Sequence, residues 1–205
     1  MNRIGWTILA LVLIAGAGFV AMTSFGGPTP EGGGSGRRTF TRIEAAVHRR
    51  LASWRGFPGG TLAVPVAGVD RAALTDTWGQ ARGQGREHHG TDIPAPGGTP
   101  VIAVADGTVE KLFQSERGGT TLYQRSADGR WTYYYAHLAA YAPGVHEGQR
   151  LRAGEPIATV GDTGDAGPGN THLHFGLVRM GPGQRWYEGE DVNPYPILAA
   201  GAAAR

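Results

Sequence analysis

Two histidines separated by a single residue stand near the end of the chain, in the run Asn170-Thr171-His172-Leu173-His174-Phe175-Gly176. The apolar and β-prone residues around them predict a β-strand, and side chains two positions apart on a strand share a face. His172 and His174 should therefore project together, roughly 7 Å apart at Cα. That arrangement suits two metal ligands, or one ligand beside an acid–base group. It also arises by chance as a solvated surface pair.

A second polar group lies earlier, in Glu87-His88-His89-Gly90-Thr91-Asp92-Ile93. His88 and Asp92 are four positions apart with a glycine between them, which disfavours a helix. In an extended segment this even spacing places both side chains on one side, with His89 directed the other way. Taken alone, the segment is equally a polar loop with an acid in it.

The third group is the aromatic run Trp131-Thr132-Tyr133-Tyr134-Tyr135-Ala136-His137-Leu138. Alternation along a strand places Trp131, Tyr133, Tyr135 and His137 on one face. An aromatic face of this kind usually packs against a neighbouring strand. His137, at its end, is either a core residue or a functional group beside the other histidines.

Together the three segments supply the residues of a metal site. Catalytic zinc keeps three protein ligands of the histidine and carboxylate type and leaves one position for water. His88, Asp92 and one of His172 and His174 provide such a set. The chain has no cysteine, so thiolate ligands, disulfides and cysteine nucleophiles are excluded. Two histidines then remain for proton transfer and charge stabilisation.

The elements that would carry these groups begin after an apolar N-terminus. Residues 4–25 form an almost unbroken apolar run, long enough to cross a bilayer. Residues 1–25 are therefore a transmembrane anchor or a signal peptide with Ala15-Gly16-Ala17 as its cleavage site, and the anchor is favoured because no better site follows the apolar run. Either interpretation predicts an extracytoplasmic location for the remainder, anchored to the cytoplasmic membrane in the first case. Residues 26–37 are a Gly/Pro-rich linker.

Residues 38–60 are expected to form a short amphipathic helix and a connector. Thr41 and Glu44 have the spacing of a capping box, and Gly56 follows the helix. The helix has an apolar stripe and a basic face. The stripe is predicted to pack on the main domain; the alternative is that its arginines meet anionic lipid or wall polymer.

Residues 61–198 have the sequence pattern of an antiparallel all-β domain, barrel- or sandwich-like. A tail follows at residues 199–205. Asp106-Gly107 and Asp128-Gly129 are turn signals, and the second should close a hairpin. These residues carry eleven basic and fifteen acidic side chains, which argues against nucleic-acid binding. Residues 70–74 are the only stretch after residue 60 that resembles a helix, and the resemblance is weak. Strands are predicted at residues 61–65, 100–105, 108–113, 120–125, 131–138, 156–160 and 172–178.

Ordered motifs over about 120 residues resemble those of the lysostaphin/LytM-type zinc endopeptidases, which cut peptide cross-bridges in bacterial cell walls. The resemblance runs from Trp78-Gly79 to Asn193-Pro194, and its ordered motifs make it specific. Its other motifs are Gly85-Arg86-Glu87-His88-His89-Gly90-Thr91-Asp92-Ile93, Ala95-Pro96-Gly97-Gly98-Thr99-Pro100-Val101, Ala105-Asp106-Gly107-Thr108-Val109, Tyr135-Ala136-His137-Leu138, Gly148-Gln149-Arg150-Leu151-Arg152-Ala153-Gly154 and Thr171-His172-Leu173-His174-Phe175.

The resemblance implies one Zn²⁺ per domain, bound by His88, Asp92 and His174, with His137 and His172 as the catalytic pair. It also implies that the substrates are peptidoglycan peptides. Two departures from the family pattern affect the expected cleft, the loop at residues 162–170 and Gly176. Tyr135, which shares a strand face with His137, is a candidate for lining the substrate groove.

Three other functions fit parts of the sequence. The first is a catalytically inactive relative that binds cell-wall peptide or activates another wall hydrolase, although such relatives usually lose metal ligands. The second is a lipoyl- or biotinyl-type carrier, but the only lysine, Lys111, lies inside a predicted strand and not at a hairpin tip. The third is a structural metal-binding domain without turnover, which leaves two histidines unexplained.

Overall fold

The computed structural model describes residues 62–200. The predictions for residues 1–25, 26–37 and 38–60 lie outside the described residues, and so does most of the predicted tail. Among residues 62–200, no helix is both long and apolar enough to cross a bilayer.

The described residues form a mostly β structure in which every strand pairing is antiparallel, as the sequence predicts. The consecutive strands β5 (Gly107–Ser115), β6 (Gly119–Ser126) and β7 (Trp131–Tyr141) are joined by short turns, and Asp128-Gly129 closes the second hairpin. The main path of the larger sheet runs β11 (Glu190–Val192), β10 (His172–Arg179), β7, β6, β5 and β8 (Arg150–Leu151).

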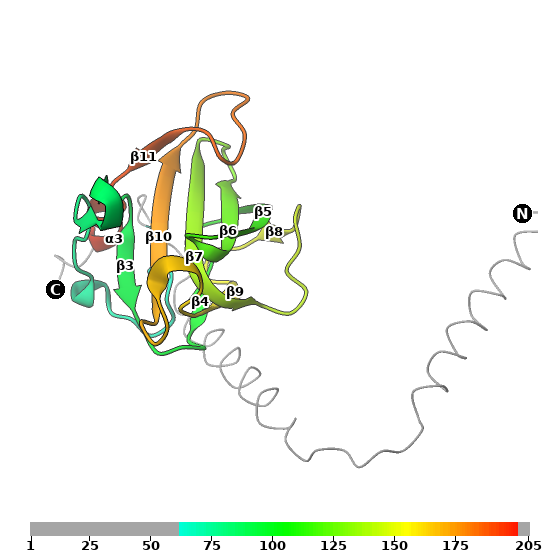
Figure 1. Cartoon of the computed structure of the whole chain (residues 1–205). Coiled ribbons are helices and arrows are strands. Elements are labelled where there is room, and N and C mark those ends of the chain that lie inside the picture. The colour runs from blue at the N-terminus through cyan, green and yellow to red at the C-terminus, as the bar shows by residue number, and fades with distance from the viewer. Residues whose placement is uncertain (1–61, 201–205) are drawn as a thin grey trace, which may run out of the picture. The chain divides into compact units, whose positions relative to one another are not determined.

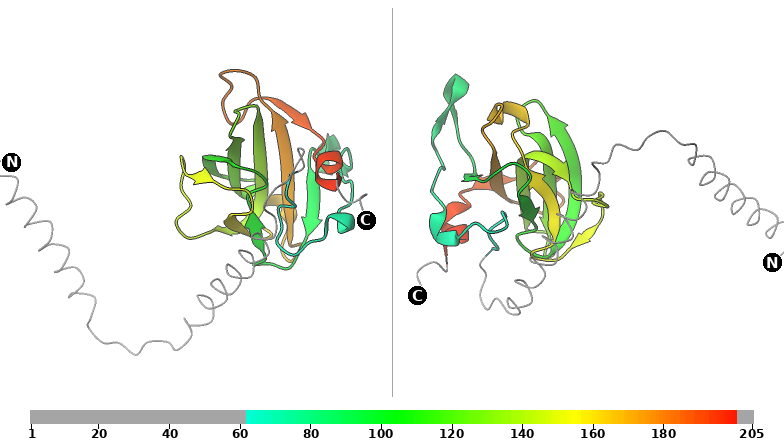
Figure 2. Two further views of the ribbon diagram at one scale, coloured as in Figure 1. Left: turned by 180° about the vertical axis from the view of Figure 1, so that it is seen from behind. Right: turned by 90° about the horizontal axis from the view of Figure 1, so that it is seen from below.

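Strand β7 changes partners along its length, which brings a second group of strands onto the sheet. Its first half pairs with β10 and β6, whereas its last residues pair with β9 (Pro156–Val160). β9 in turn pairs with β4 (Pro100–Ile102). On the other edge of β10, β3 (Thr91–Pro94) pairs with the first half of that strand and β11 with the second. Figures 1 and 2 show β10 and β7 side by side at the centre.

Several short elements were not predicted. A two-stranded ribbon of β1 (Ala81–Arg82) and β2 (Arg86–Glu87) encloses the 3-10 turn η2 (Gly83–Gly85). The helix α3 (Tyr195–Ala199) closes the described part of the chain, and a further turn, η3 (Gly164–Ala166), lies before β10. The helix-like stretch at residues 70–74 forms a 3-10 turn, η1 (Arg71–Ala73). Residues 62–65 form no regular strand, although Val66 makes an isolated bridge with Val101.

The hydrophobic core is formed by buried side chains of β3, β4, β5, β6, β7, β9 and β10, and Tyr135 is one of them. Tyr135 is fully buried; its hydroxyl donates to Gln124 Oε1 at 2.7 Å and accepts a hydrogen bond from the Val104 amide at 3.0 Å. A buried tyrosine needs such partners for its hydroxyl. The expectation that Tyr135 lines a substrate groove is therefore wrong, because the residue belongs to the core.

Candidate metal centre

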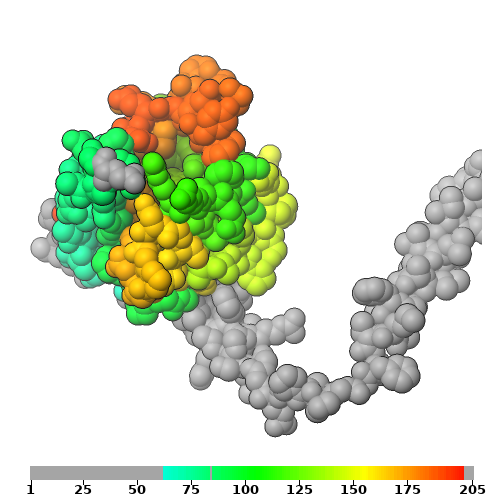
Figure 3. All heavy atoms as spheres, viewed as in Figure 1, coloured from blue at the N-terminus to red at the C-terminus, as the bar shows by residue number. Residues whose placement is uncertain are grey.

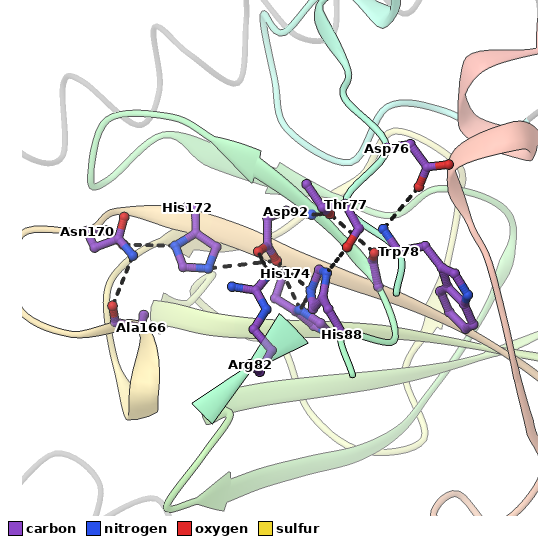
Figure 4. A network of polar contacts seen from close by, with 11 residues as sticks. Asp76, Thr77, Trp78, Arg82, His88, Asp92, Ala166, Asn170, His172 and His174 are labelled. Atoms are coloured by element: carbon purple, nitrogen blue, oxygen red, sulfur yellow. Dashed lines mark hydrogen bonds and ion pairs between the residues drawn. The ribbon is translucent and has the colours of Figure 1, made fainter. Parts of the chain in front are cut away.

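Three side chains from two paired strands and the turn before them converge on one point (Figure 4). His88 Nε2 lies 2.8 Å from His174 Nδ1 and 3.0 Å from Asp92 Oδ1, and the last two atoms are 3.1 Å apart. The register of β3 with β10 places Asp92 directly opposite His174. Ligands bound tetrahedrally to zinc lie roughly 3.3 Å from one another. The triangle of donor atoms is only a few tenths of an ångström smaller, so the three residues fit a small metal ion.

Thr77, which the sequence did not single out, holds two of these side chains. His88 Nδ1 donates to the carbonyl oxygen of Thr77 at 2.7 Å, which leaves the lone pair of His88 Nε2 directed at the centre. The amide of Asp92 donates to Thr77 Oγ1 at 3.0 Å. Partners of this kind fix the tautomer and orientation of metal ligands. Since one of the two contacts uses a backbone carbonyl, residue type alone gave little signal for Thr77.

Gly90 leaves room for the ring of His174. A Cβ atom at this position would lie 2.5 Å from His174 Cε1 and 2.9 Å from the carbonyl oxygen of Phe175. Contacts below 3.0 Å are prohibitive, and the second would be with backbone. The glycine between His88 and Asp92 is thus required by the packing of the third member of the group.

The environment of the group favours an ionised Asp92 beside a neutral His174 ring. Burial alone would raise the pKa of Asp92, but the neighbouring imidazoles of His174 and His88 hold it well below the usual range. Burial lowers the pKa of His174, against the opposing effect of Asp92. A carboxylate and neutral imidazoles are the protonation states that bind a metal.

His137 and His172 lie beside the triangle, with ring centroids 4.8 Å apart. His137 Nδ1 donates to the carbonyl of Thr163 at 2.8 Å, and His172 Nδ1 donates to the carbonyl of Asn170 at 2.9 Å. Both contacts use Nδ1, so Nε2 is the nitrogen of each ring that remains for other partners, and His172 Nε2 is 3.9 Å from Asp92 Oδ1. The loop at residues 162–170 therefore orients both of these histidines.

His137 reaches the site through an unusual backbone conformation. It has φ +59°, the only positive φ of a non-glycine residue among residues 62–200. Tyr134, Ala136 and His137 all line the same cleft, so alternation fails at His137. The sequence prediction that His137 shares the face of Tyr133 and Tyr135 is wrong for this reason, since those tyrosines are buried.

His89 is directed away from the group, as alternation predicts. Its ring stacks on Trp78 with centroids 5.0 Å apart, and its Nδ1 lies 2.9 Å from Asp191 Oδ2. The structure thus brings together His88, Asp92, His137, His172 and His174 and leaves His89 at the surface.

The group lies in a cleft of about 980 Å³ beside the β10–β11 loop, the orange segment in Figure 3. One part of the cleft is polar and contains the histidines, Asp92 and three arginines; the other part is aromatic. Ring centroids in the aromatic part lie 4.7 to 5.8 Å apart, and they form a row from His174 through Tyr134 and Tyr123 to Trp186. The cleft is large enough for several residues of a peptide.

Gly176 borders the aromatic part of the cleft. It lies opposite Tyr134 in the register of β10 with β7, and a Cβ atom there would lie 3.2 Å from Tyr134 Cδ1. Such a contact is tighter than is usual, so a side chain at this position would require Tyr134 to move. Gly176 lets the ring lie against the strand.

An antiparallel β domain whose cleft holds a His-Asp-His donor set and two further histidines has the construction of a metal-dependent hydrolase. The chain belongs to Peptidase family M23, whose family model matches residues 86–194, more than half of the 205 residues. The resemblance seen in the sequence is thereby confirmed.

Two curated relatives are similar to a large part of the chain. The L-Ala--D-Glu endopeptidase of Bacillus subtilis is 37% identical over 131 residues, which are 60% of this chain and 39% of that protein. The peptidoglycan DD-endopeptidase ShyC of Vibrio cholerae is 39% identical over 100 residues, which are 48% of this chain and 22% of that protein. The chain thus spans well under half the length of either relative.

A solved structure has the same fold. The catalytic domain of the antimicrobial peptidase lysostaphin from Staphylococcus simulans aligns with 61% of this chain and 90% of its own, at 29% sequence identity and a TM-score of 0.52.

Proposed function

We propose that the chain is a zinc endopeptidase that hydrolyses peptide bonds in the cross-links or stem peptides of bacterial peptidoglycan. The observation that carries the proposal is the triangle of His88 Nε2, Asp92 Oδ1 and His174 Nδ1, with edges of 2.8 to 3.1 Å. These three residues would hold the ion. Membership of Peptidase family M23 supports the class of reaction, and the names of the curated relatives support the substrate.

When bound, zinc would supply a Lewis acid and would lower the pKa of a coordinated water to about 7. In this proposal His172 accepts a proton from the attacking water at its free Nε2 and passes it to the leaving amine. A positioned acid–base group of this kind typically contributes about 10²–10⁴ in rate. His137 donates to Thr163 through Nδ1, so in this proposal it is the protonated ring, donating through Nε2–H, that stabilises the charge developing on the carbonyl oxygen of the substrate.

The location of the enzyme follows from its substrate. Peptidoglycan lies outside the cytoplasmic membrane, so we propose that the catalytic part acts in the periplasm or cell envelope. Residues 4–25 would anchor it in the membrane, and residues 26–37 would act as a tether. Comparing cell fractions, and sizing the mature protein, distinguishes an anchor from a cleaved signal.

The proposal is tested by incubating the purified chain with isolated sacculi and sequencing the peptide ends released. Cleavage should disappear on chelation and return with zinc. His174→Ala should lose both bound zinc and cleavage, whereas His146→Ala, at an exposed position, should retain both. Full activity in a thoroughly chelated preparation contradicts a zinc enzyme. Zinc binding without new peptide ends favours the alternative of an inactive relative that binds wall peptide or activates another hydrolase.

A further inference from the structure

Arg82 contacts the oxygen of Asp92 that faces away from the two histidines. The residue ends β1, and its guanidinium Nη2 donates to Asp92 Oδ2, while Oδ1 of the same carboxylate faces His88 and His174. Figure 4 shows the guanidinium beside Asp92 at the edge of the group. The two oxygens of one carboxylate thus have separate partners.

The remaining contacts of Arg82 indicate that its position serves this carboxylate. Within residues 62–200, the hydrogen bond to Asp92 is the only one that the guanidinium makes, and Arg82 Nε is buried without a partner. Burying an unpaired N–H group costs stability. An arginine extended into solvent would avoid that cost. The side chain of Arg82 is nevertheless directed into the cleft.

We propose that Arg82 is a positioning residue that holds Asp92 as a one-oxygen ligand. The inference rests on the proposed metal-dependent function. A carboxylate can bind a cation through one or both oxygens, and a catalytic site needs a coordination position left open for water. By engaging Oδ2, Arg82 prevents the carboxylate from turning and occupying that position with its second oxygen.

The charge of Arg82 and its positioning of Asp92 have opposite effects on metal affinity. Its positive charge repels a cation and competes for Asp92, so a purely electrostatic role predicts tighter metal binding when the charge is removed. A positioning role predicts weaker binding, because losing the partner that orients a metal ligand typically costs about 10- to 100-fold in affinity. The direction of the change therefore distinguishes the two roles.

The test uses Co²⁺ in place of zinc, because its visible absorption depends on the number and geometry of its ligands. The affinity of the full chain for Co²⁺ is measured by competition with a chelating dye, and the spectrum is recorded at saturation. Arg82→Ala should weaken binding by about 10- to 100-fold and change the spectrum. Arg82→Lys, which can still donate to Oδ2, should restore most of both properties.

Arg86→Ala is the matched control. Arg86 pairs with Arg82 in the register of β1 with β2, but its side chain contacts Gly83 and Asp165 and no candidate ligand. Its loss should leave Co²⁺ affinity and spectrum unchanged. An unchanged spectrum, or equal or tighter binding, in Arg82→Ala overturns the positioning role. A parent chain that binds no Co²⁺, or whose binding survives His174→Ala, contradicts the proposed function and the positioning role together.

Discussion

At the scale of single residues, His137 shows how the chain accepts local strain in order to place a functional group. A non-glycine residue in the left-handed region costs roughly 1–3 kcal/mol. The conformation is held by two hydrogen bonds of 2.8 Å, from the amide of His137 to Gly118 and from its ring to Thr163. The backbone turn moves the imidazole from the core face of β7 into the cleft.

The environment of His137 makes the stability of the metal-free chain depend on pH. Burial lowers the pKa of His137 below its ordinary value of about 6.5, although the hydrogen bond to Thr163 opposes this effect. The unfolded state therefore binds the proton more readily than the folded state. The contribution of His137 to stability is fully present above about pH 6.5, and it is lost as the pH falls toward the lower pKa of the folded state.

The expected result is a lower urea midpoint at pH 5 than at pH 7.5 for the chelated chain. His137→Asn removes the titrating group while keeping a residue that tolerates positive φ, so its midpoint should fall less over the same interval. His146→Asn, at an exposed position, controls for the substitution. An equal fall in His137→Asn and in the parent chain would exclude His137 as a source of the pH dependence.

At the scale of elements, the strands of the sheet were the most predictable part and the loops around the cleft the least. Apolar and aromatic runs such as 131–138 and 172–178 predicted β7 and β10 because alternation and β-propensity persist over many residues. Strands of two or three residues, such as β1 and β11, carry no such periodicity. Thr77 orients the candidate metal ligands partly through its backbone carbonyl. The turn at His137 depends on a single dihedral angle. Neither leaves a pattern in the sequence.

The β10–β11 loop supplies the outer end of the aromatic row, so it should affect substrate binding more than chemistry. Trp186 packs against Tyr123 with centroids 4.8 Å apart and lies at the far end of the row from His174. Removing an aromatic anchor from a binding cleft commonly costs about 2 kcal/mol, or roughly 30-fold in affinity. Trp186→Ala should therefore raise KM for wall peptides strongly and leave kcat and zinc content nearly unchanged.

Phe113→Ala is a suitable comparison for this loop. Phe113 packs on Trp186 from outside, with centroids 5.2 Å apart, and does not line the cleft. Its effect on KM should be much smaller. A loss of kcat equal to the change in KM for Trp186→Ala would instead indicate that the loop helps to assemble the catalytic group.

At the scale of the whole described domain, Arg71 ties its two ends together. The guanidinium donates to the carbonyls of Leu198 in α3 and Leu62, the latter at 2.7 Å. Charged hydrogen bonds contribute about 1.5–3 kcal/mol, and truncation leaves the acceptors unpaired. Arg71→Ala should lower the free energy of unfolding by about 2 kcal/mol in urea titrations, without changing Co²⁺ affinity. Arg152→Ala, at an exposed turn, should have little effect. Equal stabilities of the two variants would show that this tie contributes nothing to the fold.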